Sequence, residues 1–92
     1  MPKASIIIPH FNGRHHLEDC LGSLARQTVT DFEVILADNG STDGSKAFVA
    51  EYYPDTIFLE IGYNSGFTGA CNAGYEASTG EIAILLNNDT EV

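Results

Sequence analysis

Basic residues are scarce in this sequence of 92 residues, which contains 4 Lys and Arg against 13 Asp and Glu. The resulting formal net charge of −9 argues against electrostatic capture of nucleic acid or of an anionic lipid surface. The charge also restricts any phosphate-binding function, because an anionic ligand would need backbone N–H groups or a divalent cation to offset the acidic field.

Cysteines and long apolar runs are also few. Cys20 and Cys71 lack zinc-ligand spacing, and each falls on the apolar stripe of an expected helix, which predicts small buried hydrophobes in a reducing compartment. The longest apolar runs, such as Ile82–Leu86, are much too short to span a bilayer, and no signal-peptide core follows Met1. We therefore expect a cytoplasmic protein, with membrane association at the inner face only through parts outside this chain.

The sequence does contain a regular alternation of short apolar runs and amphipathic stretches. Its 43% of hydrophobic residues is ordinary for one small globular domain. Runs that do not alternate between apolar and polar residues suit strands covered on both faces. Four strands are expected, at Ser5–Pro9, Phe32–Ala37, Thr56–Ile61 and Glu81–Leu86.

Three amphipathic stretches between these runs have apolar or small residues at helical spacing, which predicts helices. Strands alternating with helices of this length predict an α/β fold with the order β-α-β-α-β-α-β and a parallel sheet with right-handed crossovers. No domain boundary is visible at Val92, so we expect a single domain over residues 1–92 that is truncated after strand four. The helices are expected to start at Asn12 or Gly13, at Ser41–Asp43 and at about Phe67, and the last two to end at about Tyr52 and Ser78.

The loops that leave the strands hold most of the glycine and unusual polar residues, whereas the loops that enter strands are brief. Open α/β sheets bind ligands at the carboxyl ends of their strands, so the four polar loops are expected to converge on one site. None of them has the dinucleotide fingerprint, and residues 40–46 miss the spacing and order of a P-loop. The loops comprise Pro9–Gly13, Asp38–Asp43, Gly62–Phe67 and Asn87–Asp89.

Residue types in these loops fit the binding of a nucleoside diphosphate. Phe11 offers an aromatic face or edge to a base, and Asp38 accepts hydrogen bonds from a base N–H or a ribose hydroxyl. Asn87 and Asp89, two residues apart at a strand end, point to one side and can present oxygen ligands to Mg²⁺ or Mn²⁺. Such a cation would bridge the diphosphate, stabilise it as a leaving group and offset the acidic field.

Four segments together resemble the family 2 glycosyltransferases of the GT-A type, and most closely the rhamnosyltransferase-like branch with an Asn-Asn-Asp form of the DxD motif. The resemblance implies a three-layer, Rossmann-like GT-A half-domain that binds a nucleotide sugar, with the acceptor half absent. It implies an inverting, metal-dependent transfer of a sugar from a UDP- or dTDP-type donor to an acceptor hydroxyl, in cell-surface polysaccharide or glycan synthesis. The segments are Ile6–Asn12, Ala37–Gly44, Asn64–Asn72 and Leu85–Thr90.

The resemblance also implies site residues, with Asp89 as the metal ligand, to which the strand-end spacing adds Asn87 as a second ligand. The family's usual second acid is replaced by Asn39, and its usual threonine-tyrosine pair is His10-Phe11 here, which removes any hydroxyl contact. The family's catalytic base lies beyond Val92, so the chain is expected to be inactive alone. The nucleotide-binding residues are expected to be Pro9, His10, Phe11, Asn12, Asp38, Asn39, Gly40, Asn64, Gly66, Phe67, Asn72 and Asn88.

Alternatives stay open for the function and for single residues. A phosphoryl-transfer α/β domain would use Asp38 or Asp89 as phospho-acceptor, but it needs a lysine and a hydroxyl at later strand ends, and the few basic residues are not placed there. A non-catalytic nucleotide-binding module would differ from a glycosyltransferase only in the full-length context.

Single residues also have alternative interpretations. Asp43 is expected to be a helix-start charge, and Tyr63 is expected to pack on its loop. Asp89–Glu91 is a second possible set of metal ligands. Because strand four would be an apolar edge, we also expect homo-oligomers or strand swapping.

Overall fold

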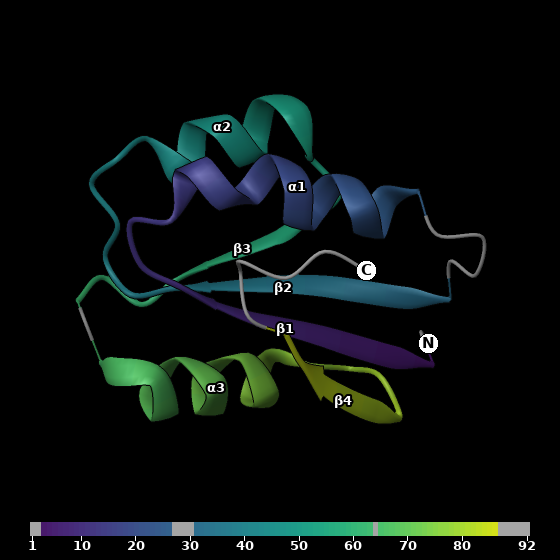
Figure 1. Ribbon diagram of the computed structural model, residues 1–92. Helices are drawn as coiled ribbons and strands as arrows, with labels where there is room; N and C mark the ends of the chain where they lie inside the picture. The colour runs from purple at the N-terminus through teal and green to yellow at the C-terminus, as the bar shows by residue number, and fades with distance from the viewer. Residues whose placement is uncertain (1–2, 27–30, 64, 87–92) are drawn as a thin grey trace.

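The computed structural model describes residues 3–26, 31–63 and 65–86. Within them a single parallel sheet has the strand order β3-β2-β1-β4, and a helix follows each of the first three strands (Figure 1). This arrangement confirms the predicted order of elements, and it places the fourth strand beside the first. The elements are β1 Ala4–His10, α1 Arg14–Ala25, β2 Phe32–Asp38, α2 Ser45–Tyr52, β3 Ile57–Glu60, α3 Gly66–Ala77 and β4 Ile82–Leu85.

The two central strands form the core of a three-layer structure. α1 and α2 cover one face of the sheet and α3 covers the other (Figure 1). Ile8 and Leu36 belong to the cluster packed with α1, and both are fully buried, as is Ile7. Burial of one such side chain contributes about 1.5–3 kcal/mol. On the α3 side, Gly74 lets the helix approach so closely that a Cβ there would lie 2.4 Å from Cγ2 of Ile7.

The outer strands differ from the centre. The expectation of strands covered on both faces is confirmed for β1 and β2 but is wrong for β4, where Ile82, Ile84 and Leu85 are 50%, 44% and 54% exposed. Within the described residues β4 pairs along one edge only, with β1. Such an exposed apolar edge is what self-association would require, and oligomerisation stays a prediction.

Two local expectations need correction. α2 begins at Ser45 and not at Ser41–Asp43, because Gly44 precedes it in a left-handed conformation with φ of 84°. Cys20 is fully buried as expected, whereas Cys71 is only half-buried, although burial still raises the pKa of its thiol. Among the helices in the described ranges, none is long and apolar enough to cross a membrane.

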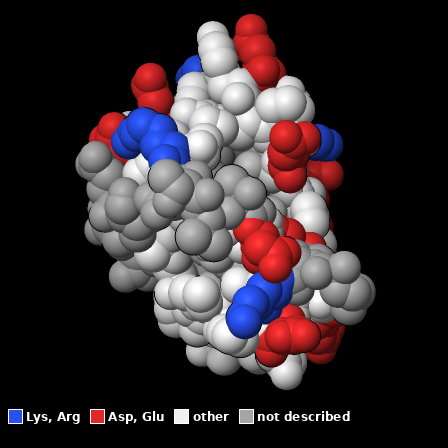
Figure 2. All heavy atoms as spheres, turned by 90° about the vertical axis from the view of Figure 1, so that its right-hand side faces the viewer, with Lys and Arg blue, Asp and Glu red and all other residues white. Residues whose placement is uncertain are grey.

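At the amino end of the sheet, Glu33 holds the turn between α3 and β4 against β1. Its Oε2 accepts hydrogen bonds from the hydroxyl of Ser5 at 2.5 Å and from the N–H of Thr79 at 2.6 Å, and these bonds lower the pKa of the carboxyl. Figure 2 views the molecule from this end and shows acidic side chains spread over the surface. The acidic field is therefore not confined to the carboxyl ends of the strands.

Candidate functional site

The loops that leave β1, β2 and β3 gather at one end of the sheet (Figure 1). Two backbone hydrogen bonds extend the strand pairing into this region. The N–H of Asn39 donates to the carbonyl of His10 at 2.8 Å, and the N–H of Ile61 donates to the carbonyl of Asp38 at 2.9 Å. The predicted convergence is thus present for three loops, while the fourth, Asn87–Asp89, lies outside the described residues.

The loops after β1 and β2 are joined side by side. The N–H of Asn12 donates to Oγ of Ser41, and Oδ1 of Asn12 accepts from the N–H of Thr42, both at 2.8 Å. Asn12 has a φ of 49°, a left-handed conformation that asparagine adopts more readily than most residues. The sequence predicts Asn12 as a ligand contact, and the structure shows that it also links two loops.

Asp38 is 4% exposed at the end of β2, and its carboxylate holds the loop that follows. Oδ1 accepts a hydrogen bond from the hydroxyl of Ser41 at 2.5 Å, and Oδ2 accepts one from the N–H of Ser41 at 3.0 Å. This local side-chain-to-backbone turn is typical of Asp and Ser in loops. Asp38 therefore has a structural role that its position after an apolar strand does not reveal, and its remaining lone pairs are its only capacity for a ligand.

His10 points inward from the end of β1 and is 2% exposed. Its Nε2 lies 2.8 Å from Oγ of Ser45, and that hydroxyl also donates to Asp43. Burial lowers the pKa of His10, although the charges of Asp38 and Asp43 oppose the shift. The side chain of His10 thus connects β1 to the first residue of α2.

Asp43 caps two helices at once. Its Oδ2 accepts a hydrogen bond from the N–H of Arg14 at the start of α1 at 3.0 Å, and its Oδ1 accepts one from the N–H of Ser45 at the start of α2 at 3.2 Å. Burial alone would raise the pKa of Asp43, but the hydrogen bonds from Ser45 and Arg14 outweigh it and lower the pKa. Asp43 is thus confirmed as a charge at the start of a helix, and it serves the start of α1 as well as that of α2.

The loops after β2 and β3 are joined through Asn39 and Gly40. Asn39 is 4% exposed; its Oδ1 accepts from the N–H and the hydroxyl of Ser65 at 3.1 and 2.6 Å, and its Nδ2 donates to the carbonyl of Gly66 at 3.1 Å. Gly40 has a φ of 88°, and a Cβ there would lie 3.2 Å from Cα of Tyr63. The sequence predicts both residues as nucleotide contacts and does not show that their loop touches the loop after β3.

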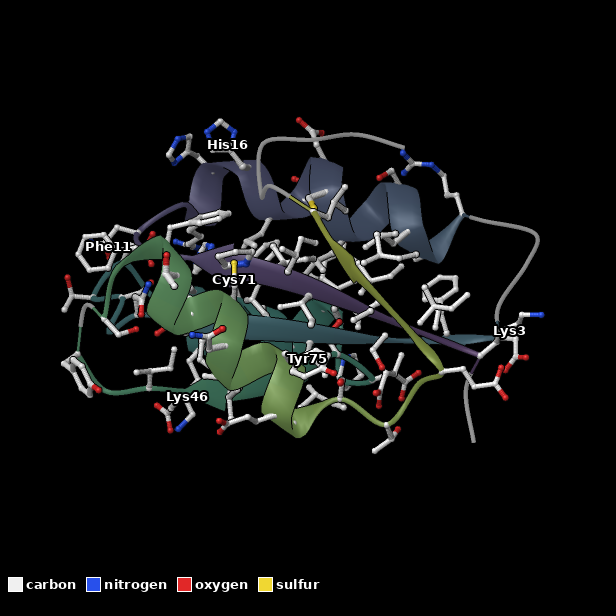
Figure 3. The ribbon with its side chains drawn as sticks, turned by 90° about the horizontal axis from the view of Figure 1, so that it is seen from below. Lys3, Phe11, His16, Lys46, Cys71 and Tyr75 are labelled. Atoms are coloured by element: carbon white, nitrogen blue, oxygen red, sulfur yellow. The ribbon has the colours of Figure 1, made fainter. Side chains whose placement is uncertain are left out.

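Three aromatic side chains remain exposed around this end of the sheet. Phe11, Tyr63 and Phe67 are 48%, 67% and 60% exposed. Figure 3 shows Phe11 at the end of the molecule opposite Lys3. Tyr63 does not pack on its loop as expected, so it joins the residues with an aromatic face available to a base or a sugar. The position of Tyr63 in a glycine-flanked polar loop was the signal for this role.

The profile described as glycosyl transferase family 2 matches residues 5–92. The chain belongs to this family. The structure of S. aureus TarS 1–349 in complex with UDP matches 95% of this chain and 27% of that chain, with a TM-score of 0.86 and 28% identity. The mannosyltransferase PcManGT from Pyrobaculum calidifontis in complex with GDP-Man and Mn²⁺ matches 98% of this chain and 28% of that chain, with a TM-score of 0.85 and 30% identity. These neighbours confirm the predicted GT-A, Rossmann-like fold.

Curated relatives agree with the family assignment. An uncharacterized glycosyltransferase of Nostoc sp. is 38% identical over 90 residues, which are 95% of this chain and 28% of the relative. The GalNAc(5)-diNAcBac-PP-undecaprenol beta-1,3-glucosyltransferase of Campylobacter jejuni is 34% identical over 96 residues, covering 100% of this chain and 31% of the relative. The chain therefore spans between about a quarter and a little over a third of the length of such curated relatives.

The remaining predicted site residues do not all lie near the joined loops. Pro9 is half-buried in β1, and Gly66 is exposed at the start of α3 with a φ of 80°. Asn72 is exposed on α3, six residues beyond Gly66 and so about 9 Å along the helix axis, which separates it from the joined loops. The predictions for Asn64, Asn87, Asn88 and Asp89 fall outside the described residues.

The predicted metal site has the donor chemistry that its cation needs. Asn87 and Asp89 offer amide and carboxylate oxygens, the hard donors that Mg²⁺ and Mn²⁺ prefer. Among residues 3–26, 31–63 and 65–86, no group of three His, Cys, Asp or Glu side chains could hold a metal ion. Asn87 and Asp89 lie outside these residues, so the metal site stays a prediction.

Proposed function

We propose that this chain is the nucleotide-sugar-binding part of an inverting, metal-dependent glycosyltransferase. The enzyme would transfer a sugar from a UDP- or dTDP-type donor to an acceptor hydroxyl, in the synthesis of cell-surface polysaccharide or glycan. The observation that carries the proposal is the joining of three strand-end loops into one surface, bordered by the exposed rings of Phe11, Tyr63 and Phe67. Solved neighbours in complex with UDP, UDP-GlcNAc and GDP-Man support a nucleotide-sugar ligand.

Each part of this surface has a separate task in donor binding. Phe11 packs against the base, which buries apolar area on both sides. Asp38 and Asn12 hold Ser41 and Thr42 in place, so that the loop keeps its shape without a ligand. A preformed site loses less entropy on binding than a loop that must first be ordered.

The diphosphate needs positive charge, since the chain itself carries a net charge of −9. A bound Mg²⁺ or Mn²⁺ would supply that charge and stabilise the diphosphate as a leaving group. Asn87 and Asp89 would hold the cation through their side-chain oxygens. Transfer also requires a general base on the acceptor side, which we assign to a part of the enzyme outside these 92 residues. The chain alone would therefore bind donor without transferring sugar.

Calorimetric titration of UDP, dTDP and GDP, with and without Mn²⁺, tests this proposal. Binding should require Mn²⁺, and Phe11→Ala should weaken it about threefold to tenfold, since an aromatic contact is worth about 0.5–1.5 kcal/mol beyond its buried area. Tyr75→Ala is the matched control, because Tyr75 is 65% exposed on α3 but lies outside the strand-end loops. Equal loss in the two variants, or affinity that is indifferent to Mn²⁺, would contradict the proposal.

The phosphoryl-transfer alternative meets an obstacle in the structure. If Asp38 were the phospho-acceptor, its carboxylate would attack a phosphoryl group, yet it is 4% exposed and both of its oxygens accept hydrogen bonds from Ser41. The other candidate acceptor, Asp89, lies outside the described residues. A nucleophilic carboxylate needs an open face, so this alternative is the weaker one. Covalent labelling of Asp38 by a small phosphate donor would reverse that judgement.

A further inference from the structure

Asn39 has the appearance of a ligand residue in the sequence, but the protein itself occupies its side chain. We propose that Asn39 is a positioning residue for the donor site, which acts by holding the start of α3 and not by touching the nucleotide. The inference rests on the proposed function for its ligand, while its structural half can be measured without any ligand. It assigns a task to the position where the family's second acid is missing.

The first observation is the geometry of one side chain that bridges two loops. The amide oxygen accepts two hydrogen bonds from Ser65, and the amide nitrogen donates one to the carbonyl of Gly66. These partners lie 26 and 27 residues away in the sequence, beyond β3. A buried amide whose two ends are both bonded is held in one orientation, because rotation would leave buried polar groups unpaired.

The second observation is the backbone conformation of the glycines that flank the tethered residues. Gly62 and Gly66 flank it with φ values of 87° and 80°, and a Cβ at either position would meet nothing within 4 Å. Glycine adopts such positive φ values at little steric cost and has more conformational freedom than other residues. Gly40 adds a second contact from the same side, against the backbone of Tyr63. The loop after β2 therefore fixes the loop after β3.

The consequence concerns the aromatic border of the site. Tyr63 precedes the tethered residues and Phe67 follows them, and both side chains are exposed. Their positions relative to Phe11 depend on where Ser65 and Gly66 are held. Releasing the tether should cost affinity through misplacement of these rings, although no ligand contact has been removed.

An aspartate at this position would do only part of the task. A carboxylate can accept from the N–H and hydroxyl of Ser65, but it cannot donate to the carbonyl of Gly66. It would also place a negative oxygen near that carbonyl, where the amide nitrogen now lies 3.1 Å away. The substitution Asn39→Asp should therefore loosen the tether without deleting it, which gives a graded series of variants.

The affinity test uses the 92-residue chain with UDP and Mn²⁺ in calorimetry. We expect Asn39→Asp to weaken binding about threefold and Asn39→Ala about tenfold, the range set by one to a few lost hydrogen bonds. Ser65→Ala should fall between the unsubstituted chain and Asn39→Ala, and the double variant should bind no worse than Asn39→Ala, since both changes remove the same tether. Ser78→Ala, which removes a serine hydroxyl bonded to Tyr75 far from these loops, should bind normally.

The structural test measures amide hydrogen exchange in the absence of nucleotide. Asn39→Ala should abolish protection of the Ser65 amide while Ile35, in the centre of the sheet, stays protected. Unchanged protection at Ser65 would overturn the tether. Additive losses of affinity in the double variant would show that Asn39 contacts the nucleotide itself, which also overturns the inference. If the unsubstituted chain binds no nucleotide, the proposed function fails, and exchange at Ser65 alone decides whether the tether exists.

Discussion

Substitution of Gly40 by alanine tests how closely the loops after β2 and β3 pack. Gly40 has a φ of 88°, and an added Cβ would lie 3.2 Å from Cα and 3.3 Å from N of Tyr63. Both are backbone atoms, so no side-chain rotation can relieve the contact. Gly62 offers a matched control, because its φ is 87° and an added Cβ meets nothing within 4 Å. The two variants therefore share the backbone strain and differ in the contact.

The expected magnitudes follow from these two contributions. An L-residue in the left-handed region costs about 1–2 kcal/mol, and restriction of the unfolded chain returns about 0.4–1 kcal/mol. We thus expect Gly62→Ala to lower the free energy of unfolding by at most about 2 kcal/mol. Gly40→Ala adds a displacement of the Tyr63 backbone, comparable to overpacking at about 1–3 kcal/mol. The difference between the variants is the quantity of interest.

Urea unfolding measures the difference in the free energy of unfolding between the two variants. Far-UV circular dichroism follows the transition, because the chain contains no tryptophan for a fluorescence signal. With a slope of about 2 kcal/mol per molar urea, Gly40→Ala should unfold about 0.5–1.5 M earlier than Gly62→Ala. Gly40→Ala should also weaken UDP binding, because Tyr63 moves with its backbone. Equal unfolding midpoints for the two variants would refute the close contact between the loops.

Two further substitutions test buried contacts, one at the strand-end loops and one between α3 and the sheet. His10→Gln should flatten the pH dependence of stability. Burial holds the pKa of His10 in the folded chain below 6.5, so the unfolded chain binds the extra proton first as the pH falls. The unsubstituted protein should therefore lose stability as the pH falls below about 6.5, and the variant should not. Urea midpoints from pH 5 to 7.5 measure this, and an equally steep loss in the variant would contradict it. Gly74→Ala places a Cβ 2.4 Å from Cγ2 of the buried Ile7 and should lower the free energy of unfolding by about 1–3 kcal/mol. A gain of about 1 kcal/mol, as helix propensity alone predicts, would show that the helix is free to move away from the sheet.

The sheet could be predicted from the sequence because its signal is local. The apolar runs of β1 and β2 are continuous, and they are the strands that are buried on both faces. The convergence of the polar loops followed from the direction of parallel strands. The exposed side chains of β4 show the limit of this reasoning, because an apolar run indicates a strand but not how much of it is covered.

The roles of single site residues could not be predicted, because they depend on partners far along the chain. His10 binds Ser45, 35 residues away, and Asn39 binds Ser65, 26 residues away. The start of α2 was misplaced for a local reason: Gly44 takes a left-handed conformation, so the helix begins at Ser45, and Asp43 lies before it, bonded to the starts of both α2 and α1. Polar loop residues thus identify a site more readily than they reveal which of them meets the ligand.

The central claim is that three loops, separated in sequence, form one binding surface for a nucleotide sugar. The most direct measurement is the set of amide chemical-shift changes in the ¹⁵N-labelled chain on addition of UDP and the diamagnetic cation Mg²⁺. The account predicts changes at Phe11, Ser41 and Ser65 together, with saturation at a single dissociation constant, and none at Thr79 at the opposite end of the sheet. Changes confined to one loop, or centred on Thr79, would contradict it.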